Sequence, residues 1–589
     1  MSSFNRYFQD ELVYLRELGR EFAEAYPALA PMLADRGADP DVERLLEGVA
    51  FLTGRVRQKL DDELPEVIAS VASLLFPHLL RPLPSATIGE LAPATGALRE
   101  NVTVPAGAEF GSVEAEGVQC RFRSATACQI VPWTIENVRR DSLPAGREQL
   151  RIELAVSPGA SASGSAPDVL PLHFAGDVAD SLRLLAWLHE ECDDVALIAT
   201  SSSGRQEAEV PLGRGAIVAL GFAEDEALLP TERVTFPGFR LIQEYFALPQ
   251  KFCFLGVRGL SALRALGDPA RFAIAIRTRR RLPDAAPVHR DSVKLHCVPV
   301  VNVFRTTTEP LRLSRTRERY PLRPAGLPAK FGQIYSVLNV QAVPRGTTRV
   351  VDVPSFFDFR HVRASGGSDM YYALHYTPAV VGDGVDVSVS FTTPEDGDAV
   401  VDAETVSLEI LATNGPVAGL LRSGDIRVPV PTSPMVATFR NIYTTTQFVP
   451  PPVGRELHWR VVAHMAMGIR GITELEVLKS ALDVYNLPAI VNRQAARASE
   501  LRADAMKALR VAPSERLYRG SIVRGIDLDL EVEESGFAGE GDLWLFGAIL
   551  DRFFAHYVSL NAFTRLTVHG LSSKVKLIWP ARSGNLTMT

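Results

Sequence analysis

The sequence predicts a multidomain α+β protein with an N-terminal helical bundle, strand-rich middle domains and a small C-terminal α+β domain. Length is the first reason: at about 100–200 residues per domain, 589 residues suggest several domains. Hydrophobic periodicity is the second reason, because apolar residues recur every three or four positions up to residue 84 and then mostly alternate. Composition is the third, since 46% hydrophobic and 22% charged residues are typical of a globular chain.

The segment 1–84 is predicted to be helical and to face two neighbours. A first apolar stripe steps by three and four residues, and Tyr7, Tyr14 and Leu18 form a second stripe beside it. Two stripes on one helix indicate contacts on two sides. We expect a partner interface at Tyr7, Phe8, Leu12, Leu15, Phe22 and Tyr26. The alternative is that these residues pack only on the following helices of the same chain.

Two more helices are expected before residue 84. Asp39-Pro40-Asp41 is a start signal, with an N-cap carboxylate followed by proline at the first helical position. A third helix is predicted to begin near Pro65 and to end at Pro77, which cannot continue it. The second helix places six apolar residues on one face, which could also pack on the first helix: Val42, Leu45, Val49, Leu52, Val56 and Leu60.

The middle of the chain is predicted to be rich in strands. Residues 85–156 alternate in short runs, and the low-complexity segment 157–166 is expected to be a flexible loop or linker. A mixed α/β domain is predicted for 167–330, with a helix near 180–189, and a β-rich domain for 331–474.

The last segment, 475–589, is predicted to be a separate α+β domain. Helices are expected at about 475–485 and 491–509, and a strand at 526–533. A glycine turn then leads to a helix at 543–560 with Asp542 as its cap, and two strands follow at 565–568 and 575–579.

Charge and cysteine content exclude several classes of protein. A net charge of −7 and a pI near 6.0 provide no basic field for nucleic acid. Five scattered cysteines without a Cys-x-x-Cys pair indicate a reducing compartment, so we expect a cytoplasmic protein. The longest uncharged apolar stretch, Val67 to Leu80, falls short of the roughly 20 residues that a membrane helix needs. We therefore expect no direct membrane insertion.

Sequence motifs for catalysis or cofactor binding are missing. The chain has no phosphate-binding loop, dinucleotide fingerprint, zinc-protease motif or nucleophile elbow. Gly536, Gly539 and Gly541 are more typical of a strand-to-helix turn than of a phosphate loop. His189 and Asp193 share a helix face, but a metal site would need a third ligand. We therefore expect no catalytic residue, no cofactor and no metal.

Three other polar groups have ordinary interpretations. The run Arg279–Arg281 is expected at a solvated strand end or a protein interface, and the acidic loop 395–404 at a solvated turn. His78 is expected to be a core or cap histidine. Two other functions stay open, a hydrolase with a dispersed site in the middle domains and a β-module that binds carbohydrate or an effector.

Several segments resemble one family, the type VI secretion system baseplate subunit TssF, also called ImpG or VasA. They occur in the same order along the whole chain, which makes the resemblance specific. The chain departs from the pattern at 157–166 and at 585–589. The similar segments are Tyr7–Leu12, Leu15–Phe22, Gly37–Gly48, Arg57–Glu63, Pro77–Pro82, Gly221–Phe222, Asp225–Pro230, Phe239–Phe246 with Pro249 and Lys251–Phe252, Pro299–Phe304 with Glu309–Pro310, Arg519–Gly520, and Asn561–Thr564.

The resemblance implies a structural part of a contractile injection machine and no enzyme. TssF-like proteins pair with TssG, two copies of the former to one of the latter, in wedges that also contain TssK and TssE. The wedges surround the VgrG spike and prime the growth of the Hcp tube and sheath. The strand-rich segment around Val104–Gly107, Phe110 and Phe122–Arg123 also resembles the baseplate J pattern of phage tails. The implied location is the cytoplasm, docked to the inner membrane through the secretion membrane complex.

Overall fold

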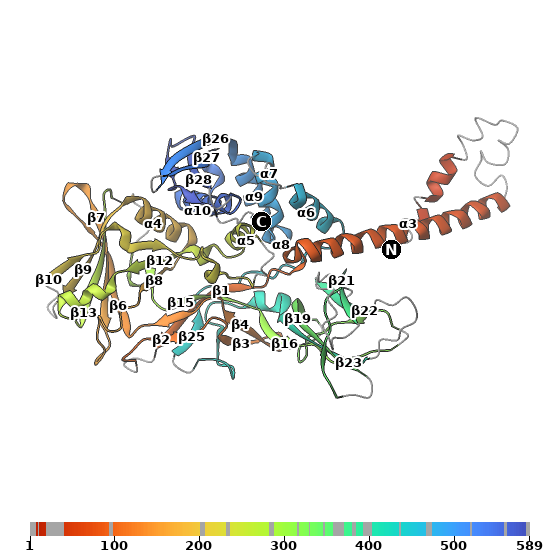
Figure 1. The fold of residues 1–589 in the computed structure, drawn as a ribbon, viewed down its shortest axis with the longest axis horizontal. Helices are drawn as coiled ribbons and strands as arrows, with labels where there is room; N and C mark the ends of the chain where they lie inside the picture. The colour runs from red at the N-terminus through yellow and green to blue at the C-terminus, as the bar shows by residue number, and fades with distance from the viewer. Residues whose placement is uncertain are drawn as a thin grey trace. The chain divides into compact units, whose positions relative to one another are not determined.

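A computed structural model of the chain describes most of its residues in two compact units. One unit comprises Met1–Leu80 with Pro452–Val461, and the other comprises Arg81–Pro451 with Val462–Thr589. Figure 1 shows the order of their elements from the red N-terminal end to the blue C-terminal end. The described residues are 8–9, 11–18, 40–93, 98–200, 206–230, 236–281, 288–314, 317–328, 330–344, 348–356, 370–379, 384–392, 403–434, 437–466, 474–518, 521–558 and 562–584.

The N-terminal unit contains one long helix where we expected two. Residues 8–9 and 11–18 are helical, and α3 then runs without a break over Pro40–Leu75. At 1.5 Å per residue its 36 residues span about 54 Å. The predicted boundary near Pro65 is wrong. Because the apolar spacing continues across this proline, one helix keeps a single apolar side on both sides of it, despite the backbone hydrogen bond that proline removes.

The first sheet of the larger unit draws its strands from distant parts of the chain. Its order is β24-β3-β4-β15-β1-β25. Strand β1, next to the edge of the sheet, pairs antiparallel with β15 on one side and with the edge strand β25 on the other. Segments 85–156, 167–330 and 331–474 therefore share one sheet. The division of the chain into five domains stays a prediction. The strands are β1 Ala86–Pro93, β3 Glu109–Ala115, β4 Val118–Ser124, β15 Cys297–Val301, β24 Ile426–Val428 and β25 Ala437–Asn441.

Two sheets and the predicted helix at 180–189 follow. The helix is α4, Val178–Glu191, which the Asp177 side chain caps by accepting the N–H groups of Ala179 and Asp180. The five-stranded sheet has the order β10-β9-β13-β7-β6, and the four-stranded sheet β11-β12-β8-β14. Their strands are β6 Trp133–Ser142, β7 Glu148–Val156, β8 Val169–Phe174, β9 Cys192–Thr200, β10 Gln206–Pro211, β11 Ile217–Ala219, β12 Phe254–Arg258, β13 Arg271–Thr278 and β14 Val293–Lys294.

The segment 157–166 is a loop, as expected, but it packs against the sheet and does not link separate units. The Trp133 indole N–H donates to Ser165 Oγ at 2.9 Å, and the Ser163 N–H donates to the Asp268 carboxylate. Ala162 and Ser165 are buried. Small residues permit this close packing, and such composition looks the same in sequence as that of a mobile linker.

Strands dominate the next part of the chain, but one helix interrupts it. Two sheets, β16-β23-β19-β20 with β17 beside β23, and β18-β22-β21, precede helix α6, Arg455–Ala466. We did not predict α6, which lies inside the segment 331–474 that we expected to be β-rich. The strands are β16 Phe304–Thr307, β17 Leu311–Arg312, β18 Tyr320–Pro321, β19 Gln333–Pro344, β20 Val351–Asp352, β21 Tyr371–Pro378, β22 Val385–Thr392 and β23 Ala403–Thr413, with a separate pair of β2 Val102–Val104 and β5 Cys128–Ile130.

The C-terminal part is a β-α-β layer with a long hairpin. The parallel strands β27 and β28 are joined through α10, in the manner of a crossover helix. We predicted α7 with its observed ends, but the helix expected at 491–509 ends at Ala505 and a strand follows it. The helix expected from residue 543 begins at Glu540. The elements are α7 Leu475–Tyr485, α8 Pro488–Val491, α9 Arg493–Ala505, β26 Met506–Tyr518, β27 Ser521–Val532, α10 Glu540–His556, β28 Ala562–Gly570, β29 Lys576–Ile578 and β30 Arg582–Ser583.

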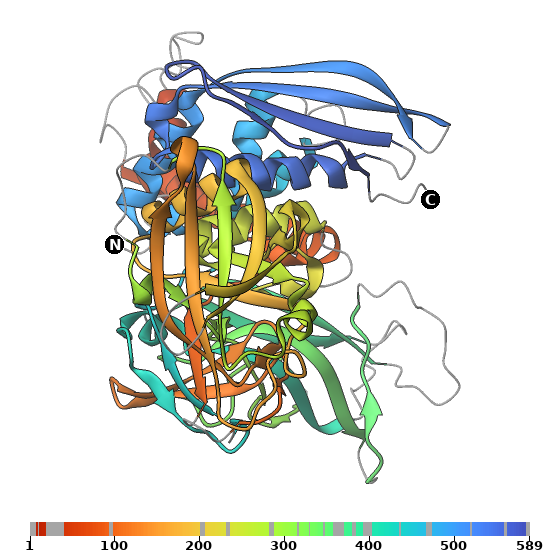
Figure 2. The ribbon, with the colours of Figure 1, turned by 90° about the vertical axis from the view of Figure 1, so that its left-hand side faces the viewer.

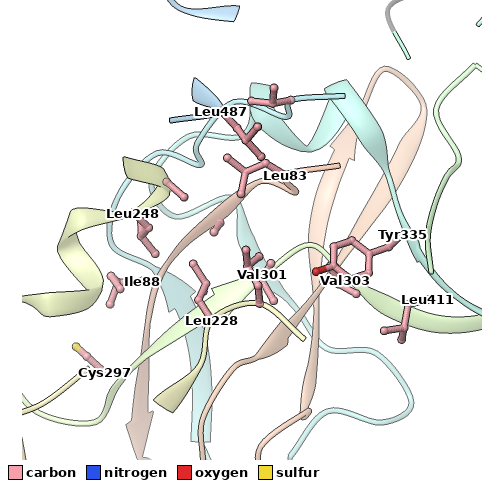
Figure 3. Close-up of a cluster of buried hydrophobic side chains, with 14 of the residues drawn as sticks. Leu83, Ile88, Leu228, Leu248, Cys297, Val301, Val303, Tyr335, Leu411 and Leu487 are labelled. Atoms are coloured by element: carbon pink, nitrogen blue, oxygen red, sulfur yellow. The ribbon is translucent and has the colours of Figure 1, made fainter. Parts of the chain in front are cut away.

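A shared apolar core joins these layers in the larger unit. Figure 3 shows side chains from β1, β15, β19, β23 and the turn before α8 meeting in one cluster. Ile88 and Val301 are fully buried within it. The core therefore forms from strands that are far apart in sequence, which fixes the whole unit as one body.

Helix α5, Pro237–Ala247, places a buried ion pair beside this core. The Lys251 ammonium donates to the Glu244 carboxylate and to the carbonyl of Gly221, and both side chains are fully buried. The Glu244 carboxylate also accepts the backbone N–H groups of Leu228 and Leu229. Burial lowers the pKa of Lys251, and the carboxylate opposes that shift. The pair thereby fixes the loop at 221–229 against α5.

A second polar junction ties α5 to the C-terminal layer. The Tyr245 hydroxyl donates to Asp542 at 2.6 Å, and Arg502 donates to the other oxygen of that carboxylate at 3.0 Å. The Ala538 N–H donates to the same carboxylate. Asp542 therefore connects α5, α9 and α10. It is not the N-cap that we predicted, because Gly539 holds that position and Asp542 lies in the first turn of the helix.

Removal of the buried ammonium should destabilise the larger unit. Lys251→Met leaves the buried Glu244 carboxylate with only the more distant Arg240 guanidinium at 3.7 Å, and breaking a buried pair costs up to about 3–5 kcal/mol. Urea denaturation should show this loss. The exposed Lys330→Met is the control and should cost less than about 0.5 kcal/mol. Equal stability of the two variants would contradict the role of the pair.

Three buried histidines should make the fold sensitive to acid. Burial lowers the pKa of His173 to about 3 and those of His189 and His296 to about 4. These values lie below the unfolded value of about 6.5. Above pH 6.5 these histidines are neutral in both the folded and the unfolded chain, so they cost no stability. As the pH falls toward 4, the unfolded chain takes up protons that the folded chain does not, and the free energy of unfolding decreases.

The histidine variants separate this effect from general acid denaturation. His173→Gln keeps a polar group near the Tyr443 hydroxyl, which lies 3.2 Å from His173 Nε2. Denaturation between pH 6.5 and 4 should show a pH slope smaller by about 1.4 kcal/mol per pH unit. The exposed His289→Gln should leave the slope unchanged. An unchanged slope in the His173 variant would refute this assignment.

Candidate assembly surfaces

The N-terminal helix shows one covered side and one uncovered side. Leu12 is 5% exposed, and Phe8 and Leu15 are half-buried. Tyr14 and Leu18, which belong to the second apolar stripe, are 56% and 42% exposed. The other predicted interface residues, Tyr7, Phe22 and Tyr26, lie outside the described residues. The second stripe therefore offers the free surface on this helix.

Helix α3 exposes the apolar face that its sequence pattern predicted. Leu45, Val49, Leu52 and Val56 are all exposed, and they recur at steps of four, three and four residues. The face continues at the end of the helix with further exposed side chains: Val67, Val71 and Leu75. Such periodicity normally marks the side of a helix that packs on something.

Helix α6 adds an exposed aromatic side chain. Trp459 is 74% exposed, and Val462 and Met465 lie three and six residues further along the helix and are also exposed. On the other side, Leu457 and Val461 are buried. The sequence analysis missed this surface because it assigned the segment to strands. The helical spacing of these residues was the signal that could have revealed it.

The magnitude of these exposures decides their interpretation. Full burial of one large apolar side chain contributes about 1.5–3 kcal/mol, so leaving a face of four uncovered forgoes several kcal/mol. Single exposed apolar residues need no explanation, whereas contiguous patches mark sites of interaction. The α3 face is contiguous, and it is therefore a candidate surface for another polypeptide.

The candidate metal ligands do not converge. His189 stacks on Trp544 with ring centroids 5.0 Å apart, and burial accounts for its lowered pKa. Asp193 instead binds Arg147 at 2.7 Å. Across the described ranges, no three His, Cys, Asp or Glu side chains are grouped to hold a metal ion. All five cysteines are buried and free.

Two glycines at the start of α10, Gly539 and Gly541, are explained by the turn and by helix packing. Gly539 has φ +105° and stands at the start of α10. A Cβ on Gly541 would lie 2.2 Å from the backbone nitrogen of Arg183, so only glycine lets α10 approach α4 this closely. The geometry explains both glycines without a phosphate.

The remaining charged groups have partners within the chain. Arg277 donates both guanidinium arms to Glu209 at 2.7 and 2.8 Å, and Arg279 and Arg280 lie against Glu191. His78 lies half-buried in the short 3-10 helix η1, Pro77–Leu80. The acidic loop at 395–402 lies outside the described residues.

An open groove of about 370 Å³ lies between α7 and α9. Phe246, Leu482 and Met506 line it together with small side chains, and three of its four charged side chains are paired. Lys479 binds Glu476, Glu500 binds Arg497, and Arg502 binds Asp542. The groove therefore offers contact area and no set of a nucleophile, a base and an oxyanion donor.

Membrane insertion through a helix finds no support in the structure. Within the part of the chain that the structure describes, every helix is too short or too polar to span a bilayer.

Comparison with known proteins gives a consistent result over the whole length. The profile of the family "Type VI secretion system, TssF" matches residues 1–586. A curated relative from Pseudomonas aeruginosa, the type VI secretion system component TssF1, is 26% identical over 622 residues, which cover 98% of both chains.

Two solved structures agree with that relationship. A chain of the TssK-TssF-TssG baseplate subcomplex superposes with a TM-score of 0.78 at 30% identity, covering 93% of this chain and 99% of that one. A chain of a type VI secretion system baseplate complex gives 0.61 at 28% identity, covering 99% and 100%. The predicted α+β class and the predicted resemblance are confirmed. The chain belongs to the TssF family of the type VI secretion system.

Proposed function

We propose that the chain is a structural subunit of a type VI secretion baseplate wedge, whose work is to hold neighbouring subunits in place. One observation carries the proposal: a chain of the TssF family leaves a contiguous apolar helix face uncovered along α3. Another polypeptide that covers this face would gain the hydrophobic stabilisation that the single chain lacks.

The first proposed partner is a TssG-like subunit, in a bundle of helices with two copies of this chain. The proposed interface consists of the six residues named from the sequence together with Tyr14 and Leu18. The exposure of the N-terminal helix supports the second stripe in this interface, because Tyr14 and Leu18 are uncovered, whereas Leu12 is already buried within the chain. A length of about 54 Å lets α3 contact more than one neighbour.

TssK is the second proposed partner, since a similar chain lies in a solved complex with TssK and TssG. TssE, the VgrG spike and the Hcp tube with its sheath are proposed neighbours in the complete baseplate. We propose that the assembly lies in the cytoplasm, docked to the inner membrane through the secretion membrane complex. These further neighbours rest on the family relationship alone.

The proposed role requires no catalytic group. A hydrolase or a ligand-binding module would need reactive or recognition groups that converge in a pocket. In the groove between α7 and α9, three of the four charged side chains pair with their own neighbours. The groove therefore favours neither alternative.

An acidic side chain in the second stripe should weaken assembly with the TssG partner. Leu18→Asp replaces a surface that burial would stabilise by about 1.5–3 kcal/mol, so binding should fall by about tenfold or more. Co-purification and titration with the TssG of the same organism would measure this. Leu571→Asp, at a site of similar exposure, is the control. Equal binding by both variants would sink the proposed interface.

A further inference from the structure

The hairpin of β26 and β27 has two unlike faces. On one face, charged side chains are paired with each other. Arg510 binds Glu531 at 2.9 Å, and Asp527 and Asp529 bind Arg565 and His569 on β28. This face is satisfied within the chain and needs no partner.

The opposite face carries apolar side chains from the root of the hairpin to its tip, and one exposed ion pair, Glu515 with Arg524 at 3.3 Å, interrupts them. At the root, Leu528 and Leu530 are fully buried on the side where α10 joins β27 to β28. Further out on this face, Val511 pairs with Leu528 and Pro513 with Ile526, the charged pair of Glu515 and Arg524 comes next, and Leu517 with Ile522 lies at the tip. Leu517 is 77% exposed and Ile522 is 70% exposed. The apolar stripe thus starts under a helix and ends in solvent.

The outer part of the hairpin also lacks support from its own sheet. Among the described residues, β28 pairs with β27 only from Arg524 onward, so the tip is two-stranded. Figure 2 shows the blue hairpin reaching past the helix that lies against the sheet. A two-stranded ribbon is at best marginally stable in water, and exposed paired leucine and isoleucine make it less so.

We propose that the distal face, formed by Val511, Pro513, Leu517, Ile522 and Ile526, is the docking site for an amphipathic helix of another polypeptide. The fold itself covers the inner part of this face with a helix, so a second helix continues the same layer. The seven strand residues from Val511 to Leu517 are separated by six rises, which span about 20 Å. A helix of about 13 residues covers that distance.

The charge pattern and the geometry disfavour a second copy as the occupant. Strand addition along β26 meets Pro513, which offers no N–H to the open edge. Face-to-face packing of two parallel hairpins brings the two α10 helices into the same space. Antiparallel packing of two hairpins sets Glu515 of one copy against Glu515 of the other, and Arg524 against Arg524, so like charges meet. A helix avoids the steric conflict and the meeting of like charges, because it can place a cation against Glu515 and an anion against Arg524.

The inference rests on the proposed function, since it needs another baseplate polypeptide to supply the helix. The probes are the TssG and TssK subunits of the same organism, assembled with the full chain. Hydrogen exchange of residues 509–526 should slow at least tenfold in the complex relative to the free chain. Leu517→Lys should abolish this protection while the N-terminal helices remain protected.

Ala512→Lys is the matched control, because it adds the same charge to the same strand on the opposite face. It should keep the protection of the wild-type chain. Unchanged exchange of the hairpin in a complex that does form would overturn the docking site and leave the baseplate role intact. Dimerisation of the isolated chain that Leu517→Lys abolishes would replace the helix with a second copy. Failure to form any complex would instead count against the proposed function.

Discussion

The constraint that shapes this protein is apolar surface that its own chain does not cover. Along α3, four large side chains recur at helical spacing and remain exposed, and the β26–β27 hairpin repeats the situation on a sheet. Burial of such residues is the largest favourable term in folding and in association. Because the chain leaves these faces open, part of its stabilisation has to come from contact with other subunits. That is a property of assembly parts, and it agrees with the family to which the chain belongs.

The interior of the larger unit shows the opposite behaviour. Its charged groups are paired even where they are fully buried, as in the contact between Glu244 and Lys251. Some of the segments that resemble the TssF family lie in this interior, because they contain Glu244, Tyr245 and Lys251. Others lie on the N-terminal helices, where Leu18 and Leu45 are exposed, so the resemblance covers both the rigid scaffold and the uncovered faces. A scaffold of this kind can hold exposed faces in fixed positions for several partners at once.

Local patterns were sufficient to predict α4 and α7, whose caps and apolar spacing depend on neighbouring residues in sequence. They were insufficient for β26, because Met506–Tyr518 contains charges and a proline and becomes a strand only through its pairing with β27. For the same reason the sheets could not be predicted: β1 pairs with strands about 200 and 350 residues away. At the interface, the two stripes of the N-terminal helix were visible in sequence. Which of them the chain covers depends on tertiary packing, which no local pattern contains.

The most direct test of the central claim is the accessibility of the α3 face in free and assembled protein. Cysteine introduced at Leu52, one exposed position of that face, can be labelled with a thiol reagent, and the five native cysteines are buried. The account predicts rapid labelling in the isolated chain and at least tenfold slower labelling in a complex with TssG and TssK. Equal labelling rates in the two states would contradict the idea that partners cover this surface.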